Sequence, residues 1–157
     1  MIQRKQSIFL LLAAIAYIVC LFLPIANVDP KAMEGQTEIF NLGIVTSDGN
    51  MSIVGMCVPL FIILSITTIL SFVTIFMYKN RKLQLNLCSI TMFLNMIWYI
   101  GLALVAFGVI SIPDVNSEDL SINFASCLPL VSFILIVMAR KGISDDEKLV
   151  RAADRIR

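Results

Sequence analysis

Polar side chains inside long apolar stretches are the residues best placed to do chemistry in this sequence. Thr67, Ser71 and Thr74 recur at helical spacing within one stretch, and Asn95 lies near the middle of another. Hydroxyl and amide groups at such depth join helices or line a small polar cavity, because an unpaired amide in hydrocarbon costs several kcal/mol. We expect a helix-packing role for these four residues, with a cavity lining as the alternative.

Residue sets that perform catalysis do not stand out. The chain has no histidine, which removes the commonest general base and the commonest metal ligand. No nucleophile is placed beside a base, no carboxylates pair within an apolar stretch, and no glycine-rich phosphate loop is visible. The sequence therefore predicts a protein without enzymatic activity, catalytic residues, metal or cofactor.

Four cysteines, Cys20, Cys57, Cys88 and Cys127, lie within apolar stretches, and none forms a CxxC pair. Zinc or redox motifs place their cysteines closer together. We expect these side chains to be small apolar packing groups. A disulfide among Cys20, Cys57 and Cys127 is the alternative.

The composition indicates a membrane protein. Of the 157 residues, 59% are hydrophobic and only 15% are charged, whereas soluble domains average about 45–50% and about 25%. A soluble chain of this size could not bury so much apolar surface, so the excess requires lipid. No basic patch is interleaved with aromatic residues, and nucleic acid is therefore not an expected partner.

Four apolar runs must position the polar residues, and none of them contains Asp, Glu, Lys or Arg. A helix needs about 20 residues to cross the hydrocarbon core, and lipid offers no partners for free backbone groups. The first run exceeds the 7–15-residue core of a signal peptide and lacks an A-x-A cleavage site, so we expect it to be retained. The sequence predicts an all-α membrane protein, a four-transmembrane-helix bundle in one domain over residues 1–157. The spans cover about 7–26, 53–78, 85–110 and 122–139.

The basic residues predict how the chain is oriented. Eleven of the twelve lie in the N-terminal tail, in the loop at 79–82 or in the tail at 140–157, and Lys31 is alone on the other side. Cytoplasmic loops carry the excess of Lys and Arg. We therefore expect both termini in the cytoplasm, with outer loops at 27–52 and 111–121.

The longer outer loop carries a strand signal. Residues 37–46 are rich in Thr, Ile, Phe and Val, which favour extended structure, and Asp48-Gly49 is a turn signal. We expect a short extended or hairpin segment that covers the outer ends of the helices.

The tail contains a predicted amphipathic helix. Gly142 is a reasonable end for the fourth span, and Ser144 with Glu147 forms a capping box that would begin a separate helix. Its apolar face can pack under its own helices, lie on the membrane or dock on a partner, and of the last two we favour a protein partner. The candidate docking residues of the tail are Leu149, Val150, Arg151, Ala153, Arg155 and Ile156.

The two ends carry a family resemblance. The opening MIQRKQSIFLLLAA (residues 1–14) and the closing DEKLVRAADRIR (residues 146–157) resemble an uncharacterised bacterial family of four-span membrane proteins, domain of unknown function 4293. The resemblance implies a four-span plan over the whole chain and a bacterial inner-membrane location, and it brings no activity. Because these ends are more specific than anchoring needs, we add Gln3 and Arg4, with the nearby Gln6, to the candidate docking residues.

Two functions fit these features. The uncharged spans and distinctive cytoplasmic ends favour an accessory or scaffolding subunit of an inner-membrane complex, with the lipid bilayer and another membrane protein or a second copy as partners. The alternative is a small transporter or channel for an uncharged or lipid-like solute, which would use Asn95 and the face of Thr67, Ser71 and Thr74.

Overall fold

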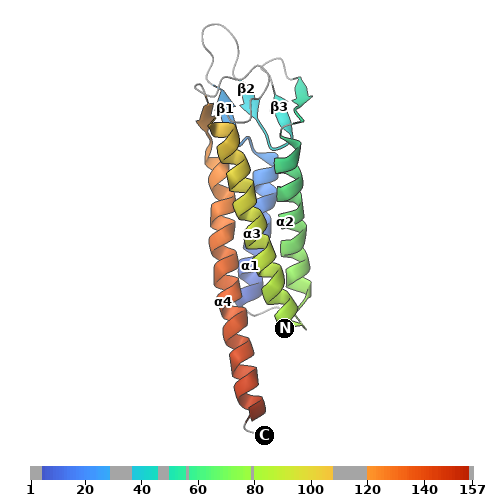
Figure 1. The fold of residues 1–157 in the computed structure, drawn as a ribbon, viewed down its shortest axis with the longest axis vertical. Coiled ribbons are helices and arrows are strands. Elements are labelled where there is room, and N and C mark those ends of the chain that lie inside the picture. The colour runs from blue at the N-terminus through green and yellow to red at the C-terminus, as the bar shows by residue number, and fades with distance from the viewer. Residues whose placement is uncertain are drawn as a thin grey trace.

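The protein is mostly helical, with a small antiparallel sheet at one end of the helices (Figure 1). The computed structural model describes residues 5–28, 37–45, 50–55, 57–78, 80–107 and 120–155, without the side chains of residues 5, 120, 151 and 153–155. The helices within these ranges are α1 (Lys5–Phe22), α2 (Val58–Phe76), α3 (Arg81–Ala106), the short 3-10 helix η2 (Phe124–Cys127) and α4 (Leu128–Arg155).

Three helical segments are apolar and long enough to cross a membrane: Val58–Phe76, Arg81–Ala106 and Phe124–Val150. The apolar part of α1, Gln6–Phe22, is shorter. α1 packs against α2 and α4, and α3 packs against the same two helices. Three of the four predicted apolar runs are thus helices of sufficient length, in agreement with a membrane protein.

The five strands form one antiparallel sheet in the order β4-β3-β2-β1-β5. The predicted hairpin is present as β2 and β3, whereas the full sheet, with β5 drawn from a distant segment, was not predicted. The Asp48-Gly49 turn signal lies outside the described residues. The strands are β1 (Ala26–Val28), β2 (Thr37–Ile39), β3 (Gly43–Val45), β4 (Met51–Ile53) and β5 (Leu120–Ile122).

Three predicted span boundaries are wrong at the sheet end. The fourth span was expected to begin at Ile122, but Ile122 ends strand β5 and α4 begins only at Leu128. The run expected to reach Ala26 leaves the helical conformation after Phe22, because Pro24 has no N–H to continue the helix, and Ala26 is already in β1. The run expected to begin at Ile53 starts with strand β4, and α2 begins only at Val58, with Pro59 in its first turn. Apolar residues at this end therefore belong to strands as well as to helices.

The predicted helix end at Gly142, with a separate helix beginning at Ser144, is also wrong, because α4 is one continuous helix through both residues. Gly142 is a point of close approach between helices: a Cβ at this position would lie 2.9 Å from Cγ of Gln6 on α1. The cost of a glycine inside a helix is only about 1 kcal/mol relative to alanine, so the flanking residues carry the helix onward. α4 extends well past the ends of the other three helices (Figure 1).

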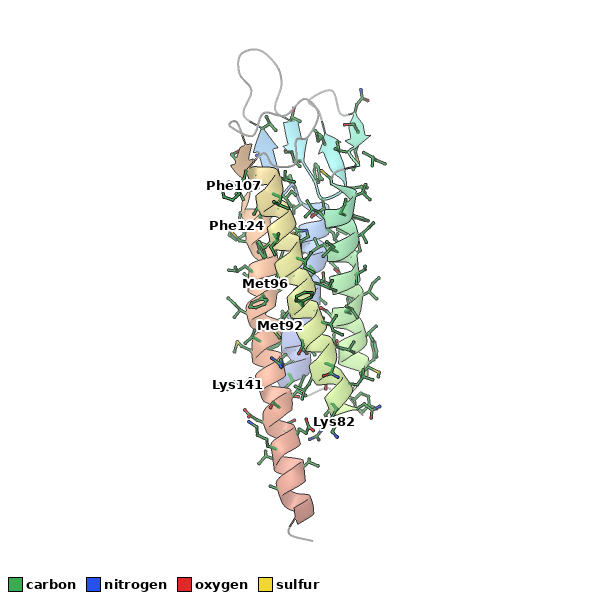
Figure 2. All side chains as sticks on the ribbon, viewed as in Figure 1. Lys82, Met92, Met96, Phe107, Phe124 and Lys141 are labelled. Carbon is green, nitrogen blue, oxygen red and sulfur yellow. The ribbon has the colours of Figure 1, made fainter. Side chains whose placement is uncertain are left out.

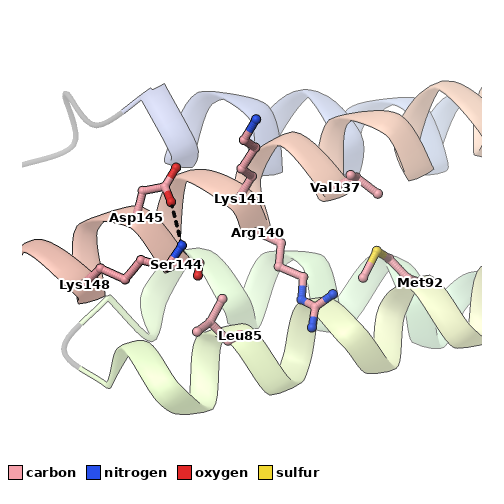
Figure 3. A pocket seen from close by; sticks show the side chains of 8 residues that line it. All are labelled: Leu85, Met92, Val137, Arg140, Lys141, Ser144, Asp145 and Lys148. Carbon is pink, nitrogen blue, oxygen red and sulfur yellow. Dashed lines mark hydrogen bonds and ion pairs between the residues drawn. The ribbon is translucent and has the colours of Figure 1, made fainter.

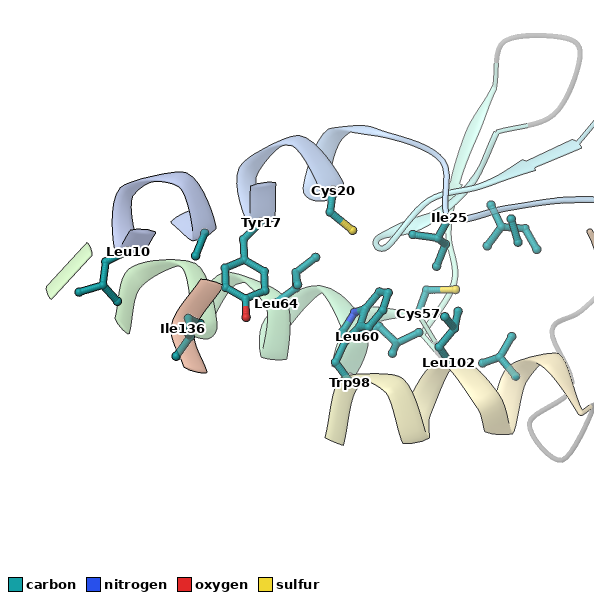
Figure 4. Close-up of a cluster of buried hydrophobic side chains, with 14 of the residues drawn as sticks. Leu10, Tyr17, Cys20, Ile25, Cys57, Leu60, Leu64, Trp98, Leu102 and Ile136 are labelled. Carbon is teal, nitrogen blue, oxygen red and sulfur yellow. The ribbon is translucent and has the colours of Figure 1, made fainter. Parts of the chain in front are cut away.

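Large apolar side chains fill the space between the helices, among them Tyr17, Leu64, Trp98 and Ile136 (Figure 4). The outward faces are apolar as well, and Phe93 on α3 is 68% exposed. Lysines mark the end of the helices opposite the sheet, where Lys82 and Lys141 lie, while Phe107 and Phe124 lie near the sheet (Figure 2). The molecule thus has three parts along its length: the sheet end, a charged end with Lys82 and Lys141, and between them an apolar middle section, called the apolar waist.

Candidate functional site

Asn95 joins three helices in the middle of the molecule. Its side chain on α3 is 1% exposed, and Nδ2 donates to the Tyr17 hydroxyl on α1 at 3.0 Å and to the Pro129 carbonyl on α4 at 2.8 Å. Oδ1 has no hydrogen-bond partner among the described residues. The two donated bonds are the geometry expected of a packing residue, and the unpaired oxygen is the one feature that a polar cavity would also use.

The hydroxyl face of α2 satisfies its own donors. Thr67, Ser71 and Thr74 are buried, and each donates to a backbone carbonyl one turn earlier in α2, at 2.7, 2.9 and 2.6 Å. Gln84 at the start of α3 adds a bond across the helix pair, from Nε2 to the Thr74 carbonyl at 3.1 Å. Since the hydroxyl protons are used within the helix, these residues act as small groups that let neighbouring helices approach.

Asn41, in the turn between β2 and β3, fastens the sheet to the helices. Its fully buried side chain donates from Nδ2 to the Cys20 carbonyl at 2.9 Å, and its Oδ1 accepts from Trp98 Nε1 at 3.2 Å. In a continuing helix the Cys20 carbonyl would accept from the residue four positions on, which is Pro24 and has no N–H. Asn41 therefore supplies the donor that Pro24 lacks.

A second set of bonds anchors the start of α4 to α1 and α3. Ser126 Oγ donates to the Ile25 carbonyl at 2.6 Å, and Tyr99 Oη donates to the Ser126 carbonyl at 2.8 Å. Ser132 Oγ, fully buried on α4, lies 3.1 Å from the Ala13 carbonyl on α1. Sequence reasoning missed these residues and Asn41. Ser126 and Ser132 lie within the predicted apolar run at 122–139, and that position was the signal that could have found them.

At the charged end, α3 and α4 are tied together and enclose a groove. Arg81 Nη1 donates to the Asp146 carbonyl at 2.7 Å, and Lys148 Nζ pairs with Asp145 Oδ1 at 3.2 Å. The groove lies beside these contacts (Figure 3). Its lining combines apolar and basic side chains.

The predicted docking residues at the end of α4 are exposed where the structure describes them. Leu149 is 71% exposed and Val150 is 44% exposed, so neither packs under its own helices. Arg151, Ala153 and Arg155 belong to α4, but their side chains are outside the description, and Gln3, Arg4 and Ile156 lie outside the described residues.

The four cysteines are free thiols: Cys20, Cys57 and Cys88 are buried and Cys127 is exposed. The first three agree with the expected packing role. The alternative, a disulfide among Cys20, Cys57 and Cys127, is not present. Cys127 lies on the outer surface and is the exception to the packing prediction.

These features define a mostly helical protein with three apolar helices long enough to cross a membrane, a small sheet and buried amide contacts between helices. The chain belongs to the family described as Domain of unknown function (DUF4293), whose profile matches residues 2–156. The resemblance seen at the two ends of the sequence is thereby confirmed. No curated protein matches the sequence.

Proposed function

We propose that this protein crosses the bacterial inner membrane four times and serves there as a non-enzymatic accessory or scaffolding subunit. In this proposal the end of α4 docks on another membrane protein from the cytoplasmic side. The observation that carries the docking is the unbroken α4, which projects past its neighbours with Leu149 and Val150 exposed.

The fourth crossing is α1. Its 18 residues give a length of about 27 Å at 1.5 Å per residue, close to the hydrocarbon thickness of about 30 Å. It is also held between α2 and α4, which are both long enough to cross. Its outward side chains Ile8, Leu12 and Ile15 are apolar and exposed, as expected of a face that meets lipid.

The charged end is assigned to the cytoplasm, because α1 begins and α4 ends there (Figure 1) and the basic residues gather there. Single cysteines test this orientation in intact cells. A cysteine at Glu38 in β2 reacts with a membrane-impermeant thiol reagent, whereas one at Asn80 reacts only after permeabilisation. Labelling of the Asn80 position in intact cells would reverse the assignment.

Protein docking is favoured over the membrane surface by the direction of the helix. An amphipathic helix that binds a membrane surface lies in the plane of the interface. The end of α4 instead continues along the axis of the crossing segment and carries its apolar side chains away from the lipid. The acidic Asp145, Asp146 and Glu147 would further weaken attraction to anionic headgroups.

A matched pair of cysteines tests the docking. Leu149 and the side chain of Lys148 are almost equally exposed, at 71% and 73%, and adjacent helical residues point about 100° apart. Each cysteine is introduced alone into a chain whose native cysteines are replaced by alanine. Reactivity towards a soluble thiol reagent is then compared in native membrane vesicles and in purified protein reconstituted into phosphatidylcholine vesicles.

We expect a cysteine at position 149 to be protected in native membranes relative to position 148, and the two to react equally after purification. The protection should persist at about 0.5 M salt, where the screening length falls to a few Å, since apolar burial is not screened. Equal reactivity in native membranes would refute docking. Protection that disappears with salt would assign the contact to lipid instead.

A small transporter or channel for an uncharged or lipid-like solute is the second candidate, and one observation favours it: the unpaired Oδ1 of Asn95. The hydroxyls of Thr67, Ser71 and Thr74 offer less support, since they bond within their own helix. Solute flux through the purified protein that is lost in Asn95→Leu would favour this candidate over the first.

A further inference from the structure

A groove of about 390 Å³ runs between α3 and α4 at the charged end (Figure 3). Apolar side chains line one part and charged or polar side chains line the rest. Arg140 extends from α4 across the groove toward α3, between Leu85 and Met92 (Figure 3). The lining residues are Leu85, Met92, Val137, Arg140, Lys141, Ser144, Asp145 and Lys148.

The lining changes in polarity along the helix axis. Met92 and Val137 lie at the end nearest the apolar waist, and Asp145 and Lys148 lie at the opposite end. From Val137 to Lys148 the helix rises about 17 Å at 1.5 Å per residue. A phospholipid shows the same order over a comparable length: acyl chain, then phosphate, then polar headgroup.

The groove carries an excess of positive charge in its middle. Lys148 pairs with Asp145 at 3.2 Å, and Asp145 is the one carboxylate among the lining residues that the structure describes. Arg140 and Lys141 form no ion pair with any residue that the structure describes. Both cations therefore line the groove without a fixed counter-charge, but only Arg140 extends across it toward α3, while the Lys141 side chain points away from α3 (Figure 3).

Arg140 also lies deeper than the other contacts between α3 and α4 at this end. Arg81 bonds to the carbonyl of Asp146, six positions further along α4, which places Arg140 about 9 Å closer to the apolar waist. An arginine near the edge of the hydrocarbon extends its side chain to the membrane interface, where an anion can pair with it. The headgroup phosphate of a lipid is the anion found at that depth.

We propose that this groove binds one anionic glycerophospholipid, with its phosphate at Arg140 and an acyl chain along Met92 and Val137. The inference rests on the proposed crossing of the membrane by α3 and α4, but not on docking by the end of α4. A zwitterionic lipid fits less well, since its own cation would face the basic lining.

The test uses the full-length protein in nanodiscs of phosphatidylcholine and phosphatidylglycerol at 4:1, followed by release into the gas phase and native mass spectrometry. Flotation with vesicles after an alkaline carbonate wash comes first, because it reports membrane crossing independently of lipid choice. Four variants accompany the natural sequence, and one of them, Arg140→Lys, keeps the charge. Arg140→Gln removes the central charge, Val137→Trp fills the groove without changing charge, and Lys82→Gln removes a charge from the same end outside the groove.

We expect the natural sequence and Lys82→Gln to retain one phosphatidylglycerol in preference to phosphatidylcholine. Arg140→Gln should lower this preference about fivefold, since one basic residue near anionic lipid contributes about a factor of five. Val137→Trp should lower occupancy of the site for both lipids. Arg140→Lys should keep most of the preference.

Any one of three results with lipid would overturn the site. They are equal retention of the two lipids by the natural sequence, an unchanged preference in Arg140→Gln, and an equal loss in Lys82→Gln, which would indicate general surface charge. Binding of inorganic phosphate by the detergent-solubilised protein without any lipid preference would also refute it. Failure to float after the carbonate wash would instead refute the membrane crossing.

Discussion

The contact between Asn95 and Tyr17 can be measured by a double-mutant cycle. Asn95→Leu removes both donated bonds, whereas Tyr17→Phe removes only the bond to the hydroxyl and leaves the one to the Pro129 carbonyl. Both replacements keep the buried volume close to the original, so the cycle reports hydrogen bonding rather than a new cavity.

The magnitudes follow from bonds between helices in membranes, which average about 0.6 kcal/mol each. Two lost bonds give about 1.2 kcal/mol for Asn95→Leu. Loss of the unpaired Oδ1 lowers this figure, and the Pro129 carbonyl that is left without its donor raises it. We therefore expect a loss of roughly 0.6–2 kcal/mol for this variant. Tyr17→Phe should lose about 0.6 kcal/mol, and the coupling between the two changes should also be about 0.6 kcal/mol.

The free energy of unfolding is measured by titrating the purified protein in mixed micelles with dodecyl sulfate, for the natural sequence, both single variants and the double variant. Additive losses, with coupling near zero, would mean that the Asn95–Tyr17 bond contributes nothing. A variant at Asn95 with unchanged stability and lost biological activity would refute the packing role and favour a polar cavity.

Three further changes probe the sheet and the approach of α1 to α4. Asn41→Ala should cost about 1–3 kcal/mol in the same titration, because the buried indole N–H of Trp98 loses its acceptor. Gly43→Ala should lower the melting temperature and the amide-exchange protection of β4, since its Cβ would collide with the backbone of Ser52 in the paired strand; unchanged protection would contradict the pairing. Gly142→Leu should destabilise by about 1–3 kcal/mol through overpacking against α1, whereas a more stable variant would show that the glycine only weakens the helix.

The helical part of the fold could be predicted because a long apolar run is visible in a single stretch of sequence and does not depend on distant partners. The run at 85–110 contains most of α3, and the run at 53–78 contains all of α2. The predicted helix boundaries were wrong where an apolar run includes both a strand and a helix. Ala26 and Ile53 are as apolar as helix residues but belong to strands. Gly142 was predicted to end a helix. In the structure its small size makes room for Gln6 of α1, a neighbour that the sequence does not reveal.

The polar contacts show the same division. Asn95 could be singled out because an amide in the middle of an apolar run is conspicuous and needs partners. Asn41 could not be, because it lies outside the apolar runs, in a segment expected to be extended, and its partners Cys20 and Trp98 are 21 and 57 residues away. The apolar face at the end of α4 was predicted, but the direction in which this segment projects was not. That direction follows from the unbroken α4, whereas the sequence predicted a separate helix.

The position of β5 has a consequence for how the protein is made. Strands β1 to β4 come from the first part of the chain, but β1 also pairs with β5, so that Asn27 aligns with Ser121. During synthesis from the N-terminus, that edge of β1 stays open until α3 has been produced and the chain has returned to the sheet end. Pairing at such a sequence separation is slow, and an open edge invites pairing with other chains. Closure of the sheet is therefore a late step of biogenesis, and it fixes the positions of α1 and α4 after α2 and α3 have been produced.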